Sequence, residues 1–278
     1  MITWIRPLGP DPVEGGCGPW YETRVRIHLI SDLHGAVDRL REAGRGCDAL
    51  LILGDLINVL DYHTMDGILV EVFGREPVAE AAGLRRRGRF EEARQVMGRR
   101  PGDPDELRAR FLERAHEQYE RVFDAMPDGT FVTWGNVDLP DMLRSFERPG
   151  VRVLEAAVID FDGERFGVVG GGIRTPLGIP GEVDPDEYDR RLSALGPVDA
   201  ICTHQPPRIP WLVYDVLGKR FEPGSTGLIG YIREHRPRWS FFGHVHQPLV
   251  DRMMIGPTQL VNVGHFRQTG RPWVHDTG

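Results

Sequence analysis

Cysteine is scarce in this 278-residue sequence, and long hydrophobic runs are absent from it. The three cysteines, Cys17, Cys47 and Cys202, have no paired spacing, so the sequence indicates neither a disulfide framework nor a thiolate zinc site. No segment approaches the roughly 18 consecutive apolar residues of a membrane span, and residues 1–20 lack the apolar core of a secretory signal. We therefore expect a soluble, cytoplasmic protein with no membrane partner.

Basic residues are fewer than acidic ones, because the sequence has 34 Lys and Arg and 41 Asp and Glu, which gives a net charge of −7. A protein that coats nucleic acid needs a basic surface, so this balance disfavours a nucleic-acid partner without excluding one. The sequence also contains neither a P-loop nor a GxSxG nucleophile motif. Those two ways of handling a phosphate or an acyl group are therefore not indicated.

Short apolar runs alternate with stretches of helical spacing, which is typical of an α/β sandwich. An Asp-Gly pair, Asp162-Gly163, predicts a β-hairpin within residues 151–172. Residues 1–23 are rich in Pro and Gly, and we expect them to be irregular. Five apolar runs predict strands buried on both faces, at residues 25–30, 49–55, 130–138, 198–207 and 238–246.

Residues 61–127 separate two of these predicted strands by more than a simple crossover needs. Helical spacing and dense charge occur on both sides of a break at residues 98–105, and Asp103 before Pro104 is typical of a helix start. We interpret residues 61–127 as a helical insertion or cap within a single domain that spans residues 1–278.

Side chains that can bind a metal follow five of the predicted strands. In open α/β sheets, ligands bind at the carboxyl ends of the strands. A mixture of carboxylate, amide oxygen and imidazole suits Mn²⁺, Fe²⁺ or Zn²⁺. Seven such groups exceed one tetrahedral site and fit two divalent ions that share a carboxylate. They are Asp32, His34, Asp55, Asn136, His204, His244 and His246.

These motifs resemble those of the calcineurin-like metallophosphoesterases, in the same order: DLH at 32–34, GD at 54–55, GN at 135–136, CTHQPP around His204 and GHVH at 243–246. The resemblance implies a four-layer βαββ-type sandwich of two mixed sheets flanked by helices. It implies that Asp32, His34 and His246 hold one metal, that Asn136, His204 and His244 hold another, and that Asp55 bridges them. Asp55 and Asn136 are then catalytic as well, and a metal-bridging hydroxide attacks a small phosphoester.

One motif departs from the family pattern, because GNVD at 135–138 stands where many members have GNHD or GNHE. That histidine protonates the leaving group or contacts the transition state, and Val137 can do neither. General acid assistance is worth about 10²–10⁴-fold, and a diester carries one negative charge fewer than a monoester. We therefore expect a phosphodiesterase acting on a nucleotide or another small phosphoester. A phosphomonoesterase, a nuclease and a non-catalytic metal-binding scaffold stay open as alternatives.

Four further residues have both a structural and a functional interpretation, and a fifth, His265, has one expected position. His63 is either the missing proton donor or an exposed loop histidine, and Asn58 either contacts a ligand or caps a helix. Arg174 either binds a substrate phosphate or lies on the surface. Asp138 either orients its neighbours or caps a turn, and His265 is expected to line the same edge.

Overall fold

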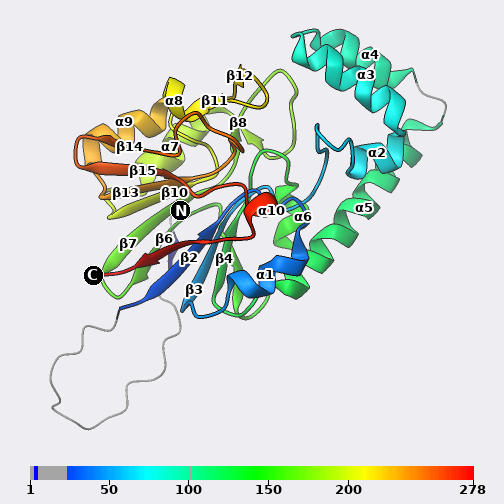
Figure 1. Ribbon diagram of the computed structural model, residues 1–278. Coiled ribbons are helices and arrows are strands. Elements are labelled where there is room, and N and C mark those ends of the chain that lie inside the picture. Colours follow the sequence, from blue (N-terminus) through cyan, green and yellow to red (C-terminus); the bar gives the residue numbers. More distant parts are fainter. Residues whose placement is uncertain (1–2, 6–23, 100–101) are drawn as a thin grey trace, which may run out of the picture.

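Two mixed β-sheets lie face to face in the computed structural model, which describes residues 3–5, 24–99 and 102–278 (Figure 1). Residues on alternate positions of each strand point to opposite faces, and both faces are apolar here. Leu29, Leu51, Phe166 and Phe241 belong to the cluster between the sheets. Helices cover both outer faces, so the four-layer sandwich expected from the sequence is confirmed.

The first sheet has the order β16-β2-β3-β4-β5. Four of its strands are parallel, and the C-terminal strand pairs antiparallel with β2. Ile30, Leu50 and Ile52 point outward from this sheet and pack under helices. The strands are β2 (Arg26–Ile30), β3 (Ala49–Leu53), β4 (Thr130–Thr133), β5 (Val151–Val153) and β16 (Trp273–Asp276).

The second sheet has the order β1-β6-β7-β10-β13-β15-β14. Asp162 and Gly163, both with positive φ, form the turn between β6 and β7, which confirms the predicted hairpin. The strands are β1 (Thr3–Ile5), β6 (Ala156–Phe161), β7 (Glu164–Val169), β10 (Ala200–Thr203), β13 (Trp239–Phe242), β14 (Arg252–Ile255) and β15 (Thr258–Asn262).

The expectation of an irregular segment at residues 1–23 is wrong for Thr3–Ile5. This stretch is β1, and it pairs parallel with β6 at the edge of the second sheet. A three-residue strand gains its hydrogen bonds from a neighbour more than 150 positions away, which no local pattern reveals. Residues 1–2 and 6–23 lie outside the described residues.

Helices from both ends of the chain flank the sheets. On the second sheet, Tyr188 and Leu192 of α7 and Leu228 and Ile232 of α9 pack against the outer face. The helices outside the insertion are α1 (Val37–Ala43), α6 (Pro140–Arg144), α7 (Pro185–Ala194), α8 (Pro210–Val213), α9 (Thr226–His235) and α10 (Phe266–Thr269). Two short strand pairs complete the fold: β8 (Gly172–Ile173) with β9 (Glu182–Val183), and β11 (Tyr214–Asp215) with β12 (Arg220–Phe221).

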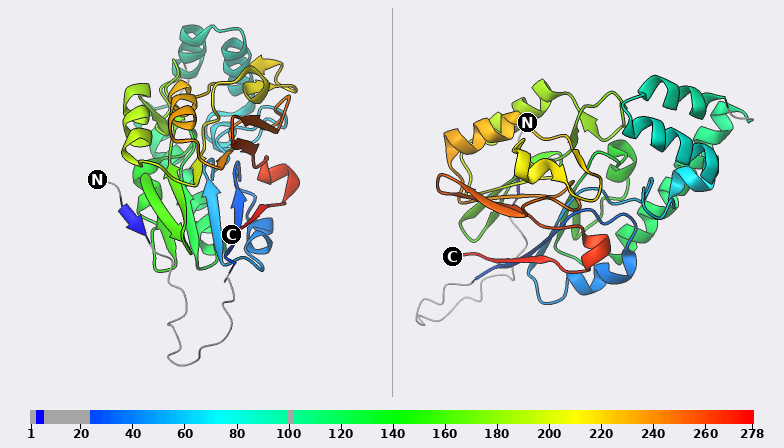
Figure 2. Two further views of the ribbon diagram at one scale, coloured as in Figure 1. Left: turned by 90° about the vertical axis from the view of Figure 1, so that its left-hand side faces the viewer. Right: turned by 45° about the horizontal axis from the view of Figure 1, so that its top comes forward.

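The described part of residues 61–127 contains four helices: α2 (Ile68–Phe73), α3 (Arg75–Arg86), α4 (Phe90–Gly98) and α5 (Pro104–Ala125). The long α5 buries Ala115, Tyr119 and Val122 against the first sheet. Helices α3 and α4 pack on each other through Leu84 and Ala93 and lie at the periphery (Figures 1 and 2). Asp103 caps α5 as predicted, since its carboxylate accepts the Asp105 N–H at 3.0 Å. The predicted helices are present here, whereas their interpretation as an insertion or cap within a single domain stays a prediction.

None of the helices in the described part of the chain has the length and hydropathy that a membrane crossing requires.

Candidate metal centre

The seven predicted ligands come together where parallel strands of both sheets end. Asp32 and His34 follow β2, Asp55 follows β3, and Asn136 follows β4. His204 follows β10, and the pair His244 and His246 follows β13. Parallel pairing forces the carboxyl ends of the strands within one sheet to the same edge. The face-to-face packing of the sheets then brings the two sets of side chains within contact distance.

His34, His246 and Asp32 form the first group. The Nε2 atoms of His34 and His246 are 3.0 Å apart. The Asp32 Oδ1 atom lies 3.3 Å from His246 Nε2 and 3.9 Å from His34 Nε2. Asp55 contributes its Oδ2 atom, which is 3.8 Å from His34 Nε2. Three donor atoms thus lie 3.0–3.9 Å from His34 Nε2, close enough for one cation to bind this group.

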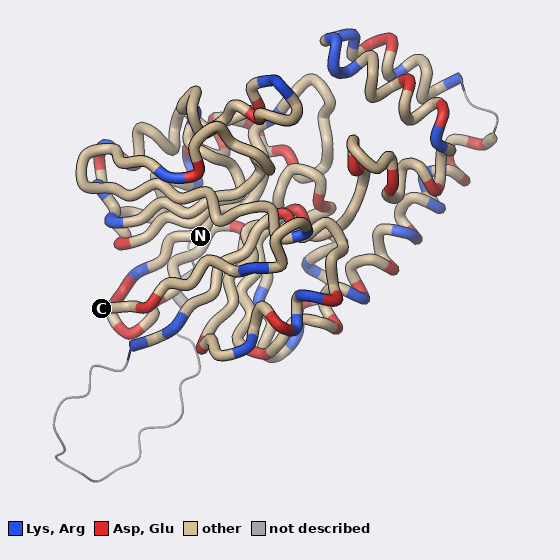
Figure 3. Tube along the Cα trace, viewed as in Figure 1, with Lys and Arg blue, Asp and Glu red and all other residues tan. Residues whose placement is uncertain are grey.

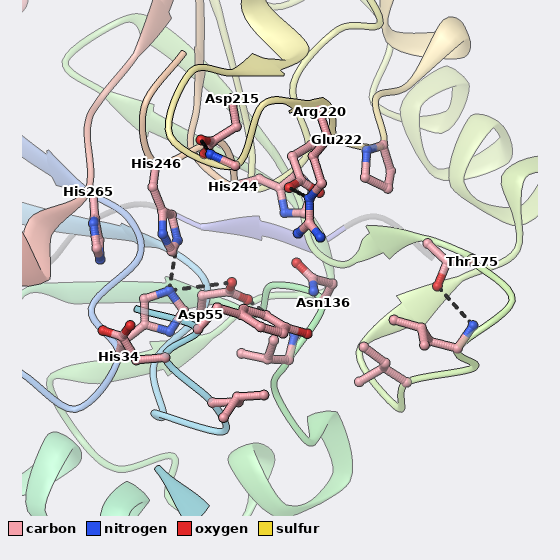
Figure 4. A pocket seen from close by; sticks show the side chains of 18 of the residues that line it. His34, Asp55, Asn136, Thr175, Asp215, Arg220, Glu222, His244, His246 and His265 are labelled. Carbon is pink, nitrogen blue, oxygen red and sulfur yellow. Dashed lines mark hydrogen bonds and ion pairs between the residues drawn. The ribbon is translucent and has the colours of Figure 1, made fainter. Parts of the chain in front are cut away.

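His204, Asn136 and His244 form the second group on the other side of Asp55. His204 Nε2 lies 3.1 Å from Asn136 Oδ1 and 3.4 Å from Asp55 Oδ1. One ligand atom from each of Asp55, His204 and His244 lies within 4.8 Å of the other two. The two carboxylate oxygens of Asp55 thus face different groups, which is the arrangement that a bridging ligand needs (Figure 4).

Four of these residues have a left-handed backbone conformation: Asp32 (φ 57°), His34 (φ 43°), Asp55 (φ 55°) and His244 (φ 69°). Such conformations cost non-glycine residues about 1–3 kcal/mol each and persist only where surrounding contacts enforce them. Backbone bonds do so here, because His34 N–H donates to the Asp55 carbonyl at 2.9 Å. The His244 N–H donates to Asp32 Oδ2 at 3.0 Å. Strain concentrated at one edge indicates a functional site.

Gly243 explains how the β13 loop approaches Asp32 so closely. A Cβ atom at residue 243 would overlap the Ser31 side chain and lie 2.5 Å from Asp32 Oδ2. Only glycine fits this contact without moving the Asp32 loop. The Gly in the GHVH motif therefore sets the separation between the ligands of β2 and those of β13.

Burial and mutual charge set the protonation of the site. Burial and the neighbouring His246 lower the pKa of His34, and burial and His204 lower the pKa of His244 to about 3. Burial and the charge of Asp32 raise the pKa of Asp55. Burial opposes ionisation of Asp32, yet a hydrogen bond and the charge of His246 lower its pKa. The site therefore offers mainly neutral imidazoles around crowded carboxylates, a donor set that suits a cation.

The described residues fit a divalent metal. The Nε2 atom of His244 is buried and has no hydrogen-bond partner among them. Buried polar atoms are almost always paired, so this nitrogen points to a missing partner. Two facing imidazole nitrogens and two facing carboxylates give the same indication. Asp32, His34, Asp55 and His246 would hold a cation in the first group, and Asp55, Asn136, His204 and His244 in the second.

Asp138 holds the two central loops together. Its buried carboxylate accepts hydrogen bonds from the N–H groups of Asp55 and Gly135, both at 2.8 Å, and of Leu56 at 3.0 Å. Tyr119 of α5 donates to the same carboxylate at 3.1 Å. Of the two interpretations from the sequence, the orienting role is the one that these contacts support.

The remaining predicted residues lie at different distances from the ligands. His63 is exposed on a loop that lines the cavity beside the centre. Asn58 also lines the cavity, and its side chain donates to Asp66 Oδ1 at 2.8 Å. Arg174 is exposed and does not line this cavity, although Ile173 and Thr175 do. Their catalytic and substrate-binding roles stay predictions.

A cavity of about 310 Å³ opens over the two groups. Apolar side chains also line it, among them Leu60, Leu177, Ile179 and Leu217. Val137 lies beside the ligands, and its N–H donates to Asp55 Oδ1 at 3.2 Å. The cavity therefore combines the polar ligand groups with several apolar side chains.

Arg220 and Arg267 also line this cavity, and no motif in the sequence marks either of them. Arg220 comes from the β11–β12 hairpin, and its guanidinium lies 5.8 Å from the Tyr62 ring centroid. Figure 4 shows it on the side of His244 and Asn136. Arg267 donates to the His34 carbonyl at 2.9 Å. In an arginine-rich chain a single arginine carries no local signal, so only the folded structure reveals either residue.

Comparisons with known proteins agree with this geometry. Residues 25–248 match the family model of the calcineurin-like phosphoesterases. One solved structure has a TM-score of 0.59 at 17% identity and covers 91% of this chain and 98% of its own. TT1561 of Thermus thermophilus has a TM-score of 0.51 at 16% identity, with 91% and 99% covered. An archaeal phosphodiesterase is more distant, with a TM-score of 0.36 at 10% identity and 91% and 93% covered.

At these identities, the two structures with TM-scores of 0.59 and 0.51 show the fold alone. No curated protein matches the chain. The family model spans most of the sequence, including all seven predicted ligands. The chain therefore belongs to the calcineurin-like phosphoesterase family, whose members are phosphoester hydrolases.

Proposed function

We propose that the protein is a phosphodiesterase that hydrolyses a nucleotide or another small phosphoester at a centre of two divalent cations. The observation that supports this choice is Val137. It lines the cavity next to the ligands, where its N–H contacts Asp55 but its side chain offers no proton. A diester needs less charge neutralisation than a monoester, so it tolerates the loss of a general acid better.

The protein's own residues have separate roles in the proposed reaction. Two cations, when bound, would polarise the phosphoryl group and lower the pKa of water; Mn²⁺, Fe²⁺ and Zn²⁺ all suit the ligands. Asp55 would hold both cations at a fixed separation through its two oxygens. Asp138 keeps Asp55 and Asn136 in register through the backbone of their loops. With these roles, the proposed reaction needs no nucleophile from the protein.

Arg220 supports the binding of an anionic substrate. Its Nε donates to Glu222 Oε1 at 2.6 Å, so the remaining N–H groups are available to the cavity. Burial opposes its charge, but Glu222 raises the pKa of Arg220, which keeps it positive. A permanently charged guanidinium binds phosphoryl oxygens well and is a poor proton donor. Arg220 would therefore neutralise charge without replacing the missing histidine as an acid.

Positive charge also borders the cavity mouth. Arg86, at the end of α3, lines the cavity from the insertion, opposite the hairpin that carries Arg220. Figure 3 shows Lys and Arg at both places in a chain of net negative charge. Such local fields draw in small anions. The apolar side chains that line the cavity suit the organic group of the ester, for example a nucleobase or an aryl ring.

A pair of chromogenic substrates tests the proposal. The metal-loaded protein should hydrolyse bis-p-nitrophenyl phosphate at least about tenfold more efficiently than p-nitrophenyl phosphate, a difference of about 1.4 kcal/mol. Asp55→Asn is the control, since it keeps the size of the side chain but removes its bridging charge. A tenfold preference for the monoester would contradict the diesterase proposal. Bound metal without turnover of either compound would favour the non-catalytic scaffold.

A cytoplasmic location stays a prediction from the sequence.

A further inference from the structure

His265 lies against the first group of ligands, although it is distant from the family motifs in the sequence. The segment after β15 runs parallel to the end of β2, where Ser31 and His265 form an isolated bridge. The Phe266 N–H donates to the Ser31 carbonyl at 3.0 Å, and the Arg267 N–H to the Asp32 carbonyl at 3.1 Å. These backbone bonds fix His265 beside Asp32.

The ring of His265 lies beside the rings of two predicted ligands. It stacks on His246 with ring centroids 3.9 Å apart and an interplanar angle of 14°. It meets His34 edge to face, with centroids 5.6 Å apart. One ring nitrogen from each of the three histidines lies within 4.8 Å of the others. Figure 4 shows His265 next to His246, with both rings near His34.

The Nε2 atom of His265 has no hydrogen-bond partner among the described residues, although it is buried. Leaving such an atom unpaired costs about 1–3 kcal/mol. His34 and His246 cannot satisfy it, because their own nitrogens already face each other at 3.0 Å. A cation within this group would provide the missing partner for all three rings.

We propose that His265 is an additional protein ligand of the cation in the first group. This inference rests on the proposed function, in which a cation binds that group. The group then consists of three imidazoles, from His34, His246 and His265, and two carboxylates, from Asp32 and Asp55. Such a set favours borderline ions such as Fe²⁺, Co²⁺ or Zn²⁺ over Mg²⁺, which prefers oxygen ligands. The seven ligands that the motifs imply do not include this residue.

Arg267 and Asp66 support the position of His265. The Arg267 side chain donates to the His34 carbonyl at 2.9 Å and to both Asp66 oxygens at 3.3 Å. Asp66 in turn accepts from Asn58 at 2.8 Å. These contacts connect the loop of His265 with the loop that follows Asp55. The third imidazole is therefore held by the same framework as the predicted ligands.

Cobalt titration of the full-length protein tests the assignment. We expect His265→Ala to weaken the affinity for the first Co²⁺ by about 10–100-fold and to change the visible d–d spectrum of the bound ion. Free imidazole should restore the spectrum. His246→Ala is the positive control. His63→Ala is the matched control, because His63 lines the same cavity without belonging to the group, and its Co²⁺ affinity should be unchanged.

A second measurement keeps His265 and covers the case in which His265→Ala fails to fold. It uses a His204→Ala variant, whose second group retains only the imidazole of His244. Pulsed electron paramagnetic resonance of this variant with one bound Cu²⁺ counts the imidazoles coupled to the metal, and we expect all three of the first group. Coupling to only a pair of imidazoles would overturn the proposal. So would a His265→Ala variant with lower thermal stability but an unchanged Co²⁺ spectrum, since that marks a packing role. A wild-type protein that binds no Co²⁺ would instead overturn the metal centre itself.

Discussion

The Asp138 carboxylate accepts a hydrogen bond at 2.8 Å from the backbone N–H of Asp55, which is 83 positions earlier in the chain. The same Oδ2 atom accepts from Gly135 at 2.8 Å. One buried side chain thus connects the loop after β3 with the loop after β4. The distance between Asp55 and Asn136, and hence the separation of the two ligand groups, depends on this connection.

Replacement of Asp138 by alanine should damage both stability and metal binding. It leaves three backbone N–H groups, of Asp55, Leu56 and Gly135, without their acceptor. Since each unpaired buried group costs about 1–3 kcal/mol, we expect the free energy of unfolding to fall by at least about 2 kcal/mol. Denaturant titration measures this. Asp141→Ala, at an exposed position, should stay within about 0.5 kcal/mol. Equal effects of the two changes would contradict the role of Asp138.

The contact at Gly243 predicts a sharp difference between two glycine substitutions. Gly243→Ala should abolish or strongly reduce metal binding, because the new methyl group would force Asp32 and Ser31 away from His244. Gly230→Ala in α9 meets nothing within 4 Å and should stabilise the helix by about 0.4–1 kcal/mol. Metal content by mass spectrometry distinguishes the two. Full occupancy in Gly243→Ala would show that the loop tolerates the shift.

The metal-free protein should lose stability as the pH rises above neutrality. Burial and Asp32 raise the pKa of Asp55, and although burial opposes the charge of His246, Asp32 raises its pKa. The folded state therefore holds more protons on these groups than the unfolded chain does, and their stabilising contribution disappears as the pH passes their folded-state pKa values. Burial lowers the pKa of His34 and His244, so these rings are neutral in both states above about pH 7.

Denaturant titrations with a chelator at about pH 7 and about pH 9 measure this loss. We expect a lower free energy of unfolding at the higher pH, and saturating Mn²⁺ should reduce the difference. Asp55→Asn should show a smaller pH dependence than the wild type, because an amide does not titrate. A metal-free protein that is more stable at the higher pH would contradict the predicted protonation of the site.

Restoring the family histidine at Val137 should shift the substrate preference. Val137 lines the cavity beside Asp55, so Val137→His places an imidazole where a leaving group can be protonated. We expect the kcat for an alkyl phosphomonoester, whose leaving group is poor and needs a proton, to rise by about tenfold or more relative to that for bis-p-nitrophenyl phosphate. Val137→Leu serves as the control for a change of volume alone. If both variants shift the ratio equally, the missing acid is not what sets the preference.

Removal of the Arg220 charge should weaken the transition state for either ester. A charge-assisted hydrogen bond is worth about 1.5–3 kcal/mol, so we expect Arg220→Met to lower kcat/KM by about 10–100-fold. Lys219→Met changes the charge of the same hairpin at a residue that does not line the cavity. Steady-state kinetics of both variants measure the effect. A comparable loss in Lys219→Met would indicate a general field of the hairpin instead of a contact by Arg220.

The sequence predicts the strands that position the site more reliably than the contacts between them. Each strand from β2 to β13 that carries a ligand is recognisable as an apolar run that ends in a polar motif. Asp138 is recognisable too, but the choice between orienting and capping depends on its long-range contact with Asp55. Arg220 and Arg267 are not recognisable from the sequence. They lie on a two-residue strand pair and on a C-terminal loop, which acquire their positions only through tertiary packing.

The metal content of the purified protein tests the central claim most directly. After dialysis against Mn²⁺ and removal of the excess, mass spectrometry of the native protein should find two ions per chain. Asp55→Asn should hold fewer, because both groups share that carboxylate. A wild-type protein that retains no ion, or an Asp55→Asn variant that retains two, would contradict a centre in which Asp55 bridges two cations.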